Sequence, residues 1–399
     1  MERICKRYNG SGILEGPTGQ GACSFEILQL TTGRLRMRCR LERDRLVYDW
    51  VGKSVELRGQ TDGQKVATRG AFVSAAQPIS AGGEWVTELK LTCGQAKIGE
   101  PEGARTLRYG LTNLQLEGNE GYREDFADGR FRLRRQSRFS IGGCEVIIRS
   151  TPGSEELLEE VQATRGIGVS AEARVIARLE EREHMDELMD RLCLLLSLGL
   201  GRGIVWVYRE SMDVDGHVVE ALHRSATTKP WSNQALVPTA GIEDFVAATY
   251  PAFLAAYERW GLRNAIRAYN DALLEGDYLE FRALKMVVVM EYLKRRYCEG
   301  RGKMSFREAV AEMCSLVRVP LSEEELELLR DARNRLVHEA TFLKESAAPS
   351  VHEQYLFLAT VVGGILLAIV GYEGDWYDWR GASDGNGPRL TPFRLAPMV

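Results

Sequence analysis

The sequence has few of the side chains from which metal sites and disulfide frameworks are built. Its eight cysteines form no C-x-x-C pair, and none has a neighbouring histidine at zinc-ligand spacing. Only five histidines occur in 399 residues. Structural zinc sites and disulfide frameworks both leave recognisable cysteine spacings, which are missing here. We therefore expect reduced thiols, and we predict neither a metal nor another cofactor.

The first twelve residues, MERICKRYNGSG, lack the apolar segment of a secretory signal, so we expect a cytoplasmic protein. Residues 355–372 carry no charge over about the length that spans a bilayer. This segment fits either a transmembrane helix or a helix buried inside a bundle. Because no Lys or Arg cluster flanks it, we predict a buried helix and no membrane partner, with Gly363 and Gly364 allowing a neighbouring helix to approach closely.

The charge is distributed unevenly along the chain, whose formal net charge is −4. Residues 1–150 hold 24 Lys and Arg against 18 Asp and Glu, or +6, so that residues 151–399 carry −10. The length is sufficient for two or three domains of roughly 100–200 residues each. We therefore predict a multidomain protein whose first part is basic.

Residues 1–150 show the pattern of strands joined by glycine-containing turns. In 34-RLRMRCRL-41, arginine and apolar residues alternate strictly, which is typical of a strand with one wet face. The pattern recurs in 130-RFRLRRQSRF-139, where Phe131 and Leu133 are expected to point inward. We predict a β-rich N-terminal domain, either a sandwich or a barrel.

The arginines of these two segments form rows that fit two interpretations. They either follow a phosphate backbone or form a solvated sheet face whose charges are matched by neighbouring strands. Aromatic stacking residues are sparse between the arginines, which favours the solvated face. The rows are Arg34, Arg36, Arg38 and Arg40 in the first segment, and Arg130, Arg132 and Arg134 in the second.

Residues 151–245 mix two patterns and are predicted to form an α+β connector. A long helix is expected over 171–200, with strands at 203–210 and 216–224. An all-α helical bundle is then predicted for 246–380, followed by a tail at 381–399.

Within that bundle, three Ser-x-x-Glu sequences fit the capping box that begins a helix. They start at Ser305, Ser322 and Ser350. Short connections between the helices suggest an antiparallel arrangement. The predicted helices are 277–298, 305–317, 322–343 and 350–371.

The third of these helices contains the stretch 330-RDARNRLVHEA-340. On an ideal helix Arg330 and His338 lie within about 40° of Asn334, on one polar face. Arg333 falls among the leucines, about 140° from His338, so the two side chains are expected to converge best if the helix distorts or a partner subunit contributes. A buried arginine needs a partner, so Arg333 is expected either to pair with Glu291 of the first helix, to reach the edge of the bundle, or to lie at an interface.

The string Arg333-Asn334-x-x-x-His338 resembles the R-x4-6-H signature of HEPN domains. Upstream, 278-YLEFRALKMVVVMEYLKRRY-297 is similar to the first long helix of that family, with Glu291 at a recurring acidic position. Downstream, the G-Y-x-G of 371-GYEGDWYDW-379 resembles the ApeA-like subgroup, which is linked to phage defence. Residues 185–210 resemble the middle part of ApeA-like proteins less closely.

The resemblance implies a metal-independent endoribonuclease that acts in anti-phage defence or abortive infection, with RNA as substrate and tRNA as one candidate. Such cleavage needs a base, an acid and positive charge beside the phosphorane, and one chain offers one suitable histidine. A homodimer would place two copies of the motif in one cleft. The expected site comprises Arg333, Asn334 and His338 as catalytic residues, Arg330 and Arg335 as substrate-binding residues, and Glu291 as support.

The N-terminal domain is then expected to sense a phage-derived trigger and to restrain the nuclease until infection. A different interpretation remains open, in which the bundle is a non-catalytic HEPN module that binds RNA or serves as a scaffold. In that case Arg333 and His338 would have only a structural role.

Overall fold

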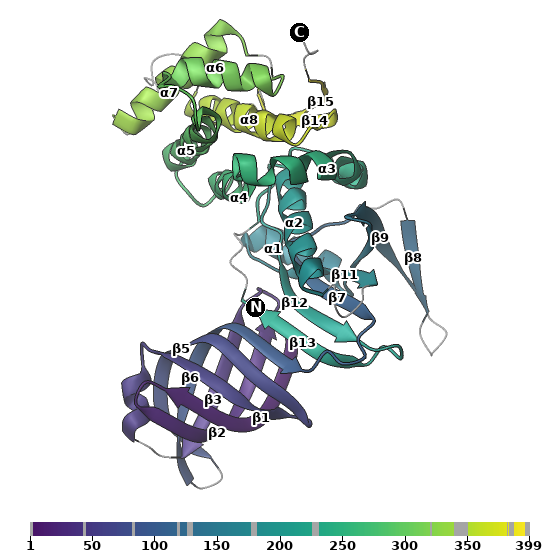
Figure 1. Cartoon of the computed structure of the whole chain (residues 1–399), viewed down its shortest axis with the longest axis vertical. Coiled ribbons are helices and arrows are strands. Elements are labelled where there is room, and N and C mark those ends of the chain that lie inside the picture. Colours follow the sequence, from purple (N-terminus) through teal and green to yellow (C-terminus); the bar gives the residue numbers. More distant parts are fainter. Residues whose placement is uncertain are drawn as a thin grey trace.

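The computed structural model describes most of the chain. The described residues are 3–42, 45–81, 84–117, 120–125, 131–176, 182–225, 231–319, 321–338, 350–380, 382 and 387–395. A β-rich first half precedes a helical second half (Figure 1). This layout agrees with the predicted order of β-rich and helical parts.

The first six strands form a closed antiparallel barrel, at the bottom of Figure 1. Strand pairs β1–β2, β2–β3, β3–β6, β6–β5, β5–β4 and β4–β1 complete the ring. The barrel encloses its own hydrophobic core. The strands are β1 (Ile4–Gly16), β2 (Gly19–Leu30), β3 (Leu35–Glu42), β4 (Ser54–Thr61), β5 (Gln64–Ala81) and β6 (Glu84–Gly99), with a short 3-10 helix at Arg45–Trp50.

Strand β3 confirms the predicted alternation. Leu35, Met37, Cys39 and Leu41 are buried, and the four arginines between and before them are exposed. Arg38 lies opposite Glu26 of β2, and Arg40 opposite Glu88 of β6, each within ion-pair distance. Neighbouring strands therefore match the charges of these two arginines, as in the solvated-face interpretation. Arg130 and the side chains of residues 131–134 lie outside the described residues.

A second group of strands extends the same sheet beyond the barrel. Residues 95–99 of β6 pair with β13, and the order continues β12-β7-β11-β10-β9-β8, all antiparallel. Strands β12 and β13, which were predicted in the connector, thus pair directly with β7 and β6 of the N-terminal region. These strands are β7 (Thr106–Thr112), β8 (Glu120–Asp125), β9 (Phe131–Ile141), β10 (Cys144–Ser150), β11 (Val169–Ile176), β12 (Trp206–Met212) and β13 (Val218–Arg224).

The helix predicted over 171–200 is wrong in its first part. Residues 169–176 form β11 between β7 and β10, and the helix begins only at Arg182. Ala171, Ala173 and Val175 are buried, while Glu172 and Arg174 are not, which is the period of a strand. Pairing on both edges overrides the helical propensity of alanine, glutamate and arginine.

Eight helices occur in the described residues. They are α1 (Ser154–Thr164), α2 (Arg182–Leu200), α3 (Ile242–Trp260), α4 (Leu262–Ala272), α5 (Leu279–Cys298), α6 (Phe306–Leu316), α7 (Glu323–His338) and α8 (Val351–Ile369). Capping boxes are present at Ser305, Ser322 and Ser350, as predicted. Residues 339–343, predicted to extend the third helix, lie outside the described residues.

The C-terminal region is not all-α, which corrects the prediction for 246–380 and the tail. Strands β14 (Gly374–Asp378) and β15 (Arg389–Phe393) form an antiparallel hairpin. Trp376 and Phe393 of this hairpin are buried and lie edge to face. The hairpin packs its aromatic rings near Gly364 of α8, where a Cβ atom would lie about 3.5 Å from the Trp376 ring.

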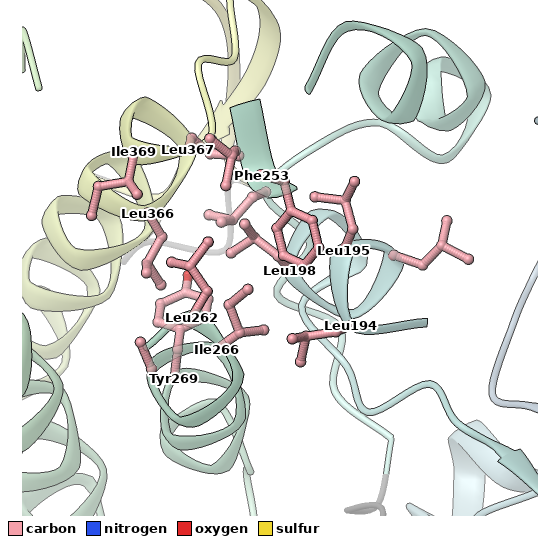
Figure 2. Close-up of a cluster of buried hydrophobic side chains, with 14 of the residues drawn as sticks. Leu194, Leu195, Leu198, Phe253, Leu262, Ile266, Tyr269, Leu366, Leu367 and Ile369 are labelled. Atoms are coloured by element: carbon pink, nitrogen blue, oxygen red, sulfur yellow. The ribbon is translucent and has the colours of Figure 1, made fainter. Parts of the chain in front are cut away.

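One hydrophobic core joins the second group of strands to the helices. In Figure 2, Leu194, Leu195 and Leu198 of α2 face Phe253 of α3, residues of α4 and residues of α8. Helix α8 is long and apolar enough to cross a membrane by composition, and 83% of its apolar window is buried within the protein. Gly363 permits the predicted close approach, because a Cβ atom there would lie 2.8 Å from the Tyr269 hydroxyl of α4.

Candidate functional site

Helix α7 carries the candidate site, and its local sequence fixes how the helix lies. The capping box of Ser322 and Glu325 begins it, with the Glu325 amide donating to the serine hydroxyl at 3.1 Å. Its apolar residues Leu326, Leu329, Ala332 and Leu336 are buried. The helix contacts α5 and α6, near the end of the molecule opposite the barrel (Figure 1). The polar face that bears Asn334 and His338 is therefore exposed.

Arg333 is the centre of a small polar cluster. Its Nε donates to Glu291 Oε1 of α5 at 3.0 Å, and its Nη1 donates to Asn334 Oδ1 at 2.9 Å. The same Nη1 lies 3.4 Å from Nε2 of His338. The Arg333 side chain is 27% exposed, and its guanidinium lies 5.9 Å from the centre of the Phe306 ring. Pairing with Glu291, one of the three arrangements expected for Arg333, is thus the one that the structure shows. The same arginine contacts both other residues of the motif.

Arg333 and His338 meet within one helix, contrary to the expectation from an ideal helix. Their separation of about 140° on an ideal helix suggested that they meet best if the helix distorts or a partner contributes. Instead, α7 is a continuous helix from Glu323 to His338, and the two side chains meet within one chain. A long arginine side chain can extend around the helix to His338, because the position of its Cα atom alone does not fix where the guanidinium lies.

Glu291 is a charged support for the cluster. Burial acts to raise the pKa of its carboxyl, but hydrogen bonds from Lys294 and Arg333, and the charges of both, outweigh burial and lower the pKa below its usual value. Lys294 Nζ lies 2.9 Å from Glu291 Oε2 and Arg333 Nε lies 3.0 Å from Oε1, so each carboxylate oxygen has a cationic partner. Glu291 thereby fixes the guanidinium on the α5 side and leaves Nη1 directed to Asn334 and His338.

The two predicted substrate-binding arginines lie outside this cluster. Arg330 pairs with Glu327 and Asp331 of its own helix, so its charge is locally matched. Arg335 is half-buried and has no hydrogen-bond or ion-pair partner among the residues that the structure describes. The structure therefore groups Arg333, Asn334, His338 and Glu291, and leaves Arg330 and Arg335 separate.

One group of side chains in the described part of the chain has the spacing of a metal site. Asp213, Asp215 and His217 lie in the turn between β12 and β13, with ligand atoms within 4.8 Å of one another. Two of the three are exposed, and the Asp213 carboxylate already accepts hydrogen bonds from the backbone of residues 215 and 217. The group is a typical acidic turn, distant in sequence from α7.

A buried ion network between the sheet and α2 was not predicted from the sequence. Arg209 of β12, 5% exposed at its side chain, pairs with Asp186 of α2 and with Glu220 of β13. The Tyr109 hydroxyl donates to Asp186 at 2.9 Å. These partners come from four separate elements, so no local spacing in the sequence indicates them. The network fixes α2, and with it the helical half, on the sheet.

Comparisons with protein families, with curated proteins and with solved structures found no match to this chain. The resemblance to HEPN domains therefore depends on the motif of α7, on the sequence of α5 and on residues 371–379. The fold and the contacts of Arg333 are the independent observations that bear on function.

Proposed function

We propose that this chain is a metal-independent endoribonuclease of the HEPN type that acts in anti-phage defence. In this proposal His338 transfers protons, Arg333 binds the scissile phosphate, and Asn334 orients the phosphate or the imidazole. Glu291 holds the guanidinium in place. Arg330 and Arg335, on the same helix, contact the RNA backbone further along the strand.

The observation that carries the proposal is the contact between Arg333 and His338 on an exposed helix face. RNA cleavage through the 2′-hydroxyl needs a group that titrates near neutral pH, and it needs positive charge beside the phosphorane. Here an imidazole and a guanidinium lie 3.4 Å apart at Nε2 and Nη1. Both can therefore contact one phosphate group, which is the arrangement that the reaction requires.

A second histidine would come from a second copy of the chain. The apolar side chains of Val288 on α5 and Val337 on α7 are 54% and 47% exposed. Val288 lies one turn before Glu291, and Val337 lies one turn after Arg333, so both flank the ion pair that joins the two helices. Exposed apolar residues beside the motif support a two-fold interface there, with both copies of His338 in one cleft.

The barrel and the strands beside it would then form the regulatory part of the enzyme. We propose that they respond to a phage-derived component and restrain the cleft until infection. The chain is expected to act in the cytoplasm, where its RNA substrates, tRNA among them, are present. The solvated arginine row of β3 is not needed for catalysis in this proposal.

A non-catalytic RNA-binding module is the second candidate, and one contact favours it. Arg333 already has a carboxylate partner in Glu291, so the pair is nearly neutral without any phosphate. An arginine in such a pair is often structural. In this case α7 would bind RNA through its exposed face, and no proton transfer would occur at His338.

Incubation of the full-length protein with total tRNA in EDTA distinguishes the two candidates. Cleavage is expected for the natural protein and for His352→Ala, which removes an exposed histidine from the first turn of α8. No cleavage is expected for His338→Ala, although it should fold normally. Undiminished cleavage by His338→Ala would exclude the proposed site. RNA binding without cleavage by the natural protein, including protein taken from phage-infected cells, would favour the binding module.

A further inference from the structure

A cavity of about 480 Å³ lies between α2, α4 and the ends of strands β12 and β13. Its volume is within the roughly 300–1,000 Å³ that small-molecule sites occupy. It lies far in sequence from the α7 motif, and none of the motif's side chains lines it. The side chains that decide its chemistry are Asp190, Trp206, Arg224, Tyr257, Arg263 and Arg267.

One of its three arginines is fully engaged. Arg224 Nη2 donates to Asp190 Oδ1 at 2.6 Å, and its Nε donates to the Trp206 carbonyl at 2.7 Å. The guanidinium stacks on the Trp206 ring, 3.3 Å from its centre. Arg224 and Asp190 therefore neutralise each other, and Arg224 is held rigidly on the wall of the cavity.

The other two arginines are not paired in this way. Arg263 and Arg267 lie one turn apart on α4, and neither has an ion pair or side-chain hydrogen bond within the part of the chain that the structure describes. Burial and then the charge of Arg263 lower the pKa of Arg267, while the charge of Asp190 acts in the opposite direction. Like charges at this spacing destabilise a helix, and arginine does not lose its proton at ordinary pH. With three arginines and one aspartate in its lining, the cavity has an excess of positive charge.

Two residues that line the cavity, Asn270 and Trp206, each have a buried polar atom without a hydrogen-bond partner among the described residues. Asn270 lies one turn beyond Arg267 and is 5% exposed, and its Oδ1 has no hydrogen-bond partner among the described residues. Nε1 of Trp206 is also buried without a hydrogen-bond partner among the described residues. Leaving a buried polar atom unpaired costs about 1–3 kcal/mol, so such atoms beside a cavity indicate a missing ligand or water.

We propose that this cavity binds a small phosphorylated molecule of nucleotide size. Its phosphate would lie between Arg263 and Arg267, where it would relieve their mutual repulsion. Asn270, which lines the cavity, would contact the polar part of the ligand, and the Tyr257 ring would border the remainder. The proposal concerns binding alone and does not depend on RNA cleavage by α7.

Calorimetric titration of the full-length protein tests this site with adenosine 5′-monophosphate, inorganic pyrophosphate and uncharged adenosine as probes. We expect the two phosphorylated probes to bind and adenosine to bind more weakly. The double variant Arg263→Glu/Arg267→Glu should weaken binding by about a hundredfold, because each lost charged hydrogen bond is worth about tenfold or more. Both side chains are exposed, so the variant should retain the melting temperature of the natural protein.

The matched control is Arg69→Glu, which reverses the charge of an exposed arginine on barrel strand β5. It should bind both phosphorylated probes as the natural protein does. Three outcomes would overturn the proposal. They are no binding of either phosphorylated probe at millimolar concentration, equal affinity for adenosine, and equal loss of binding in the double variant and in Arg69→Glu.

Discussion

Replacement of Glu291 by Gln tests how the candidate site is held together. The change keeps the shape of the side chain and removes the charge that pairs with Arg333 and Lys294. Glutamine retains one oxygen that can accept a hydrogen bond and has nearly the same size as glutamate. The Arg333 guanidinium therefore loses its ion pair, while the volume around it stays the same. We expect Arg333 to become less well positioned relative to His338.

The size of the stability effect follows from exposure. The side chains of Arg333 and Glu291 are 27% and 30% exposed, which lies between a surface pair and a buried one. We therefore expect a loss of about 1 kcal/mol, or about 2 °C in melting temperature for a chain of this size. Because the folded pKa of Glu291 is lowered, this contribution is present above about pH 4.3, the usual glutamate pKa, and is lost as the pH falls through the folded pKa.

The effect on cleavage should exceed the effect on stability. A displacement of a phosphate-binding group by about 1 Å costs up to about a hundredfold in rate, so we expect a tRNA cleavage rate reduced by about tenfold to a hundredfold. Glu299→Gln is the matched control, since it changes a more exposed ion pair at the end of the same helix. If Glu291→Gln cleaves tRNA as fast as Glu299→Gln does, Glu291 does not position the catalytic group.

Three further predictions concern other parts of the molecule. Burial lowers the pKa of His223 to about 4. Since its usual pKa is about 6.5, stability should fall between pH 6.5 and pH 4, and chemical denaturation of His223→Gln should show a smaller decrease over this window. Val288→Asp and Val337→Asp should each shift the protein towards monomer in light scattering, and unchanged mass would contradict the proposed interface. Gly201→Ala should cost about 2 kcal/mol or more, because φ is +61° and the new Cβ would lie 1.9 Å from the Gln234 carbonyl oxygen; a melting curve equal to that of the natural protein would refute this reasoning.

Local patterns in the sequence predicted much of the fold. The alternation in 34–41 predicted a strand with one wet face, and β3 has this form. The Ser-x-x-Glu sequences predicted where three helices begin, because a capping box needs only residues within one turn. The cost of burying an unpaired guanidinium predicted a partner or an interface for Arg333, and pairing with Glu291 was one of the arrangements expected.

Features that depend on distant partners were not predictable in the same way. Residues 171–176 became strand because β7 and β10 pair with them on both sides. The β14–β15 hairpin forms where its aromatic rings cover α8, which no short pattern indicates. The cavity with Arg263 and Arg267 joins α4 to residues 190–225, and a single sequence does not show this neighbourhood. The contact between Arg333 and His338 depends on the direction of the arginine side chain, and the angles of an ideal helix do not include side-chain direction.

The ends of the RNA fragments provide the most direct test of the proposed nuclease. Attack by the 2′-hydroxyl leaves a 2′,3′-cyclic phosphate on one fragment and a 5′-hydroxyl on the other. The full-length protein incubated with tRNA in EDTA should yield these ends, and His338→Ala should yield none. Fragments with 5′-phosphate and 3′-hydroxyl ends, or cyclic phosphate ends produced equally by His338→Ala, would contradict the role assigned to Arg333 and His338.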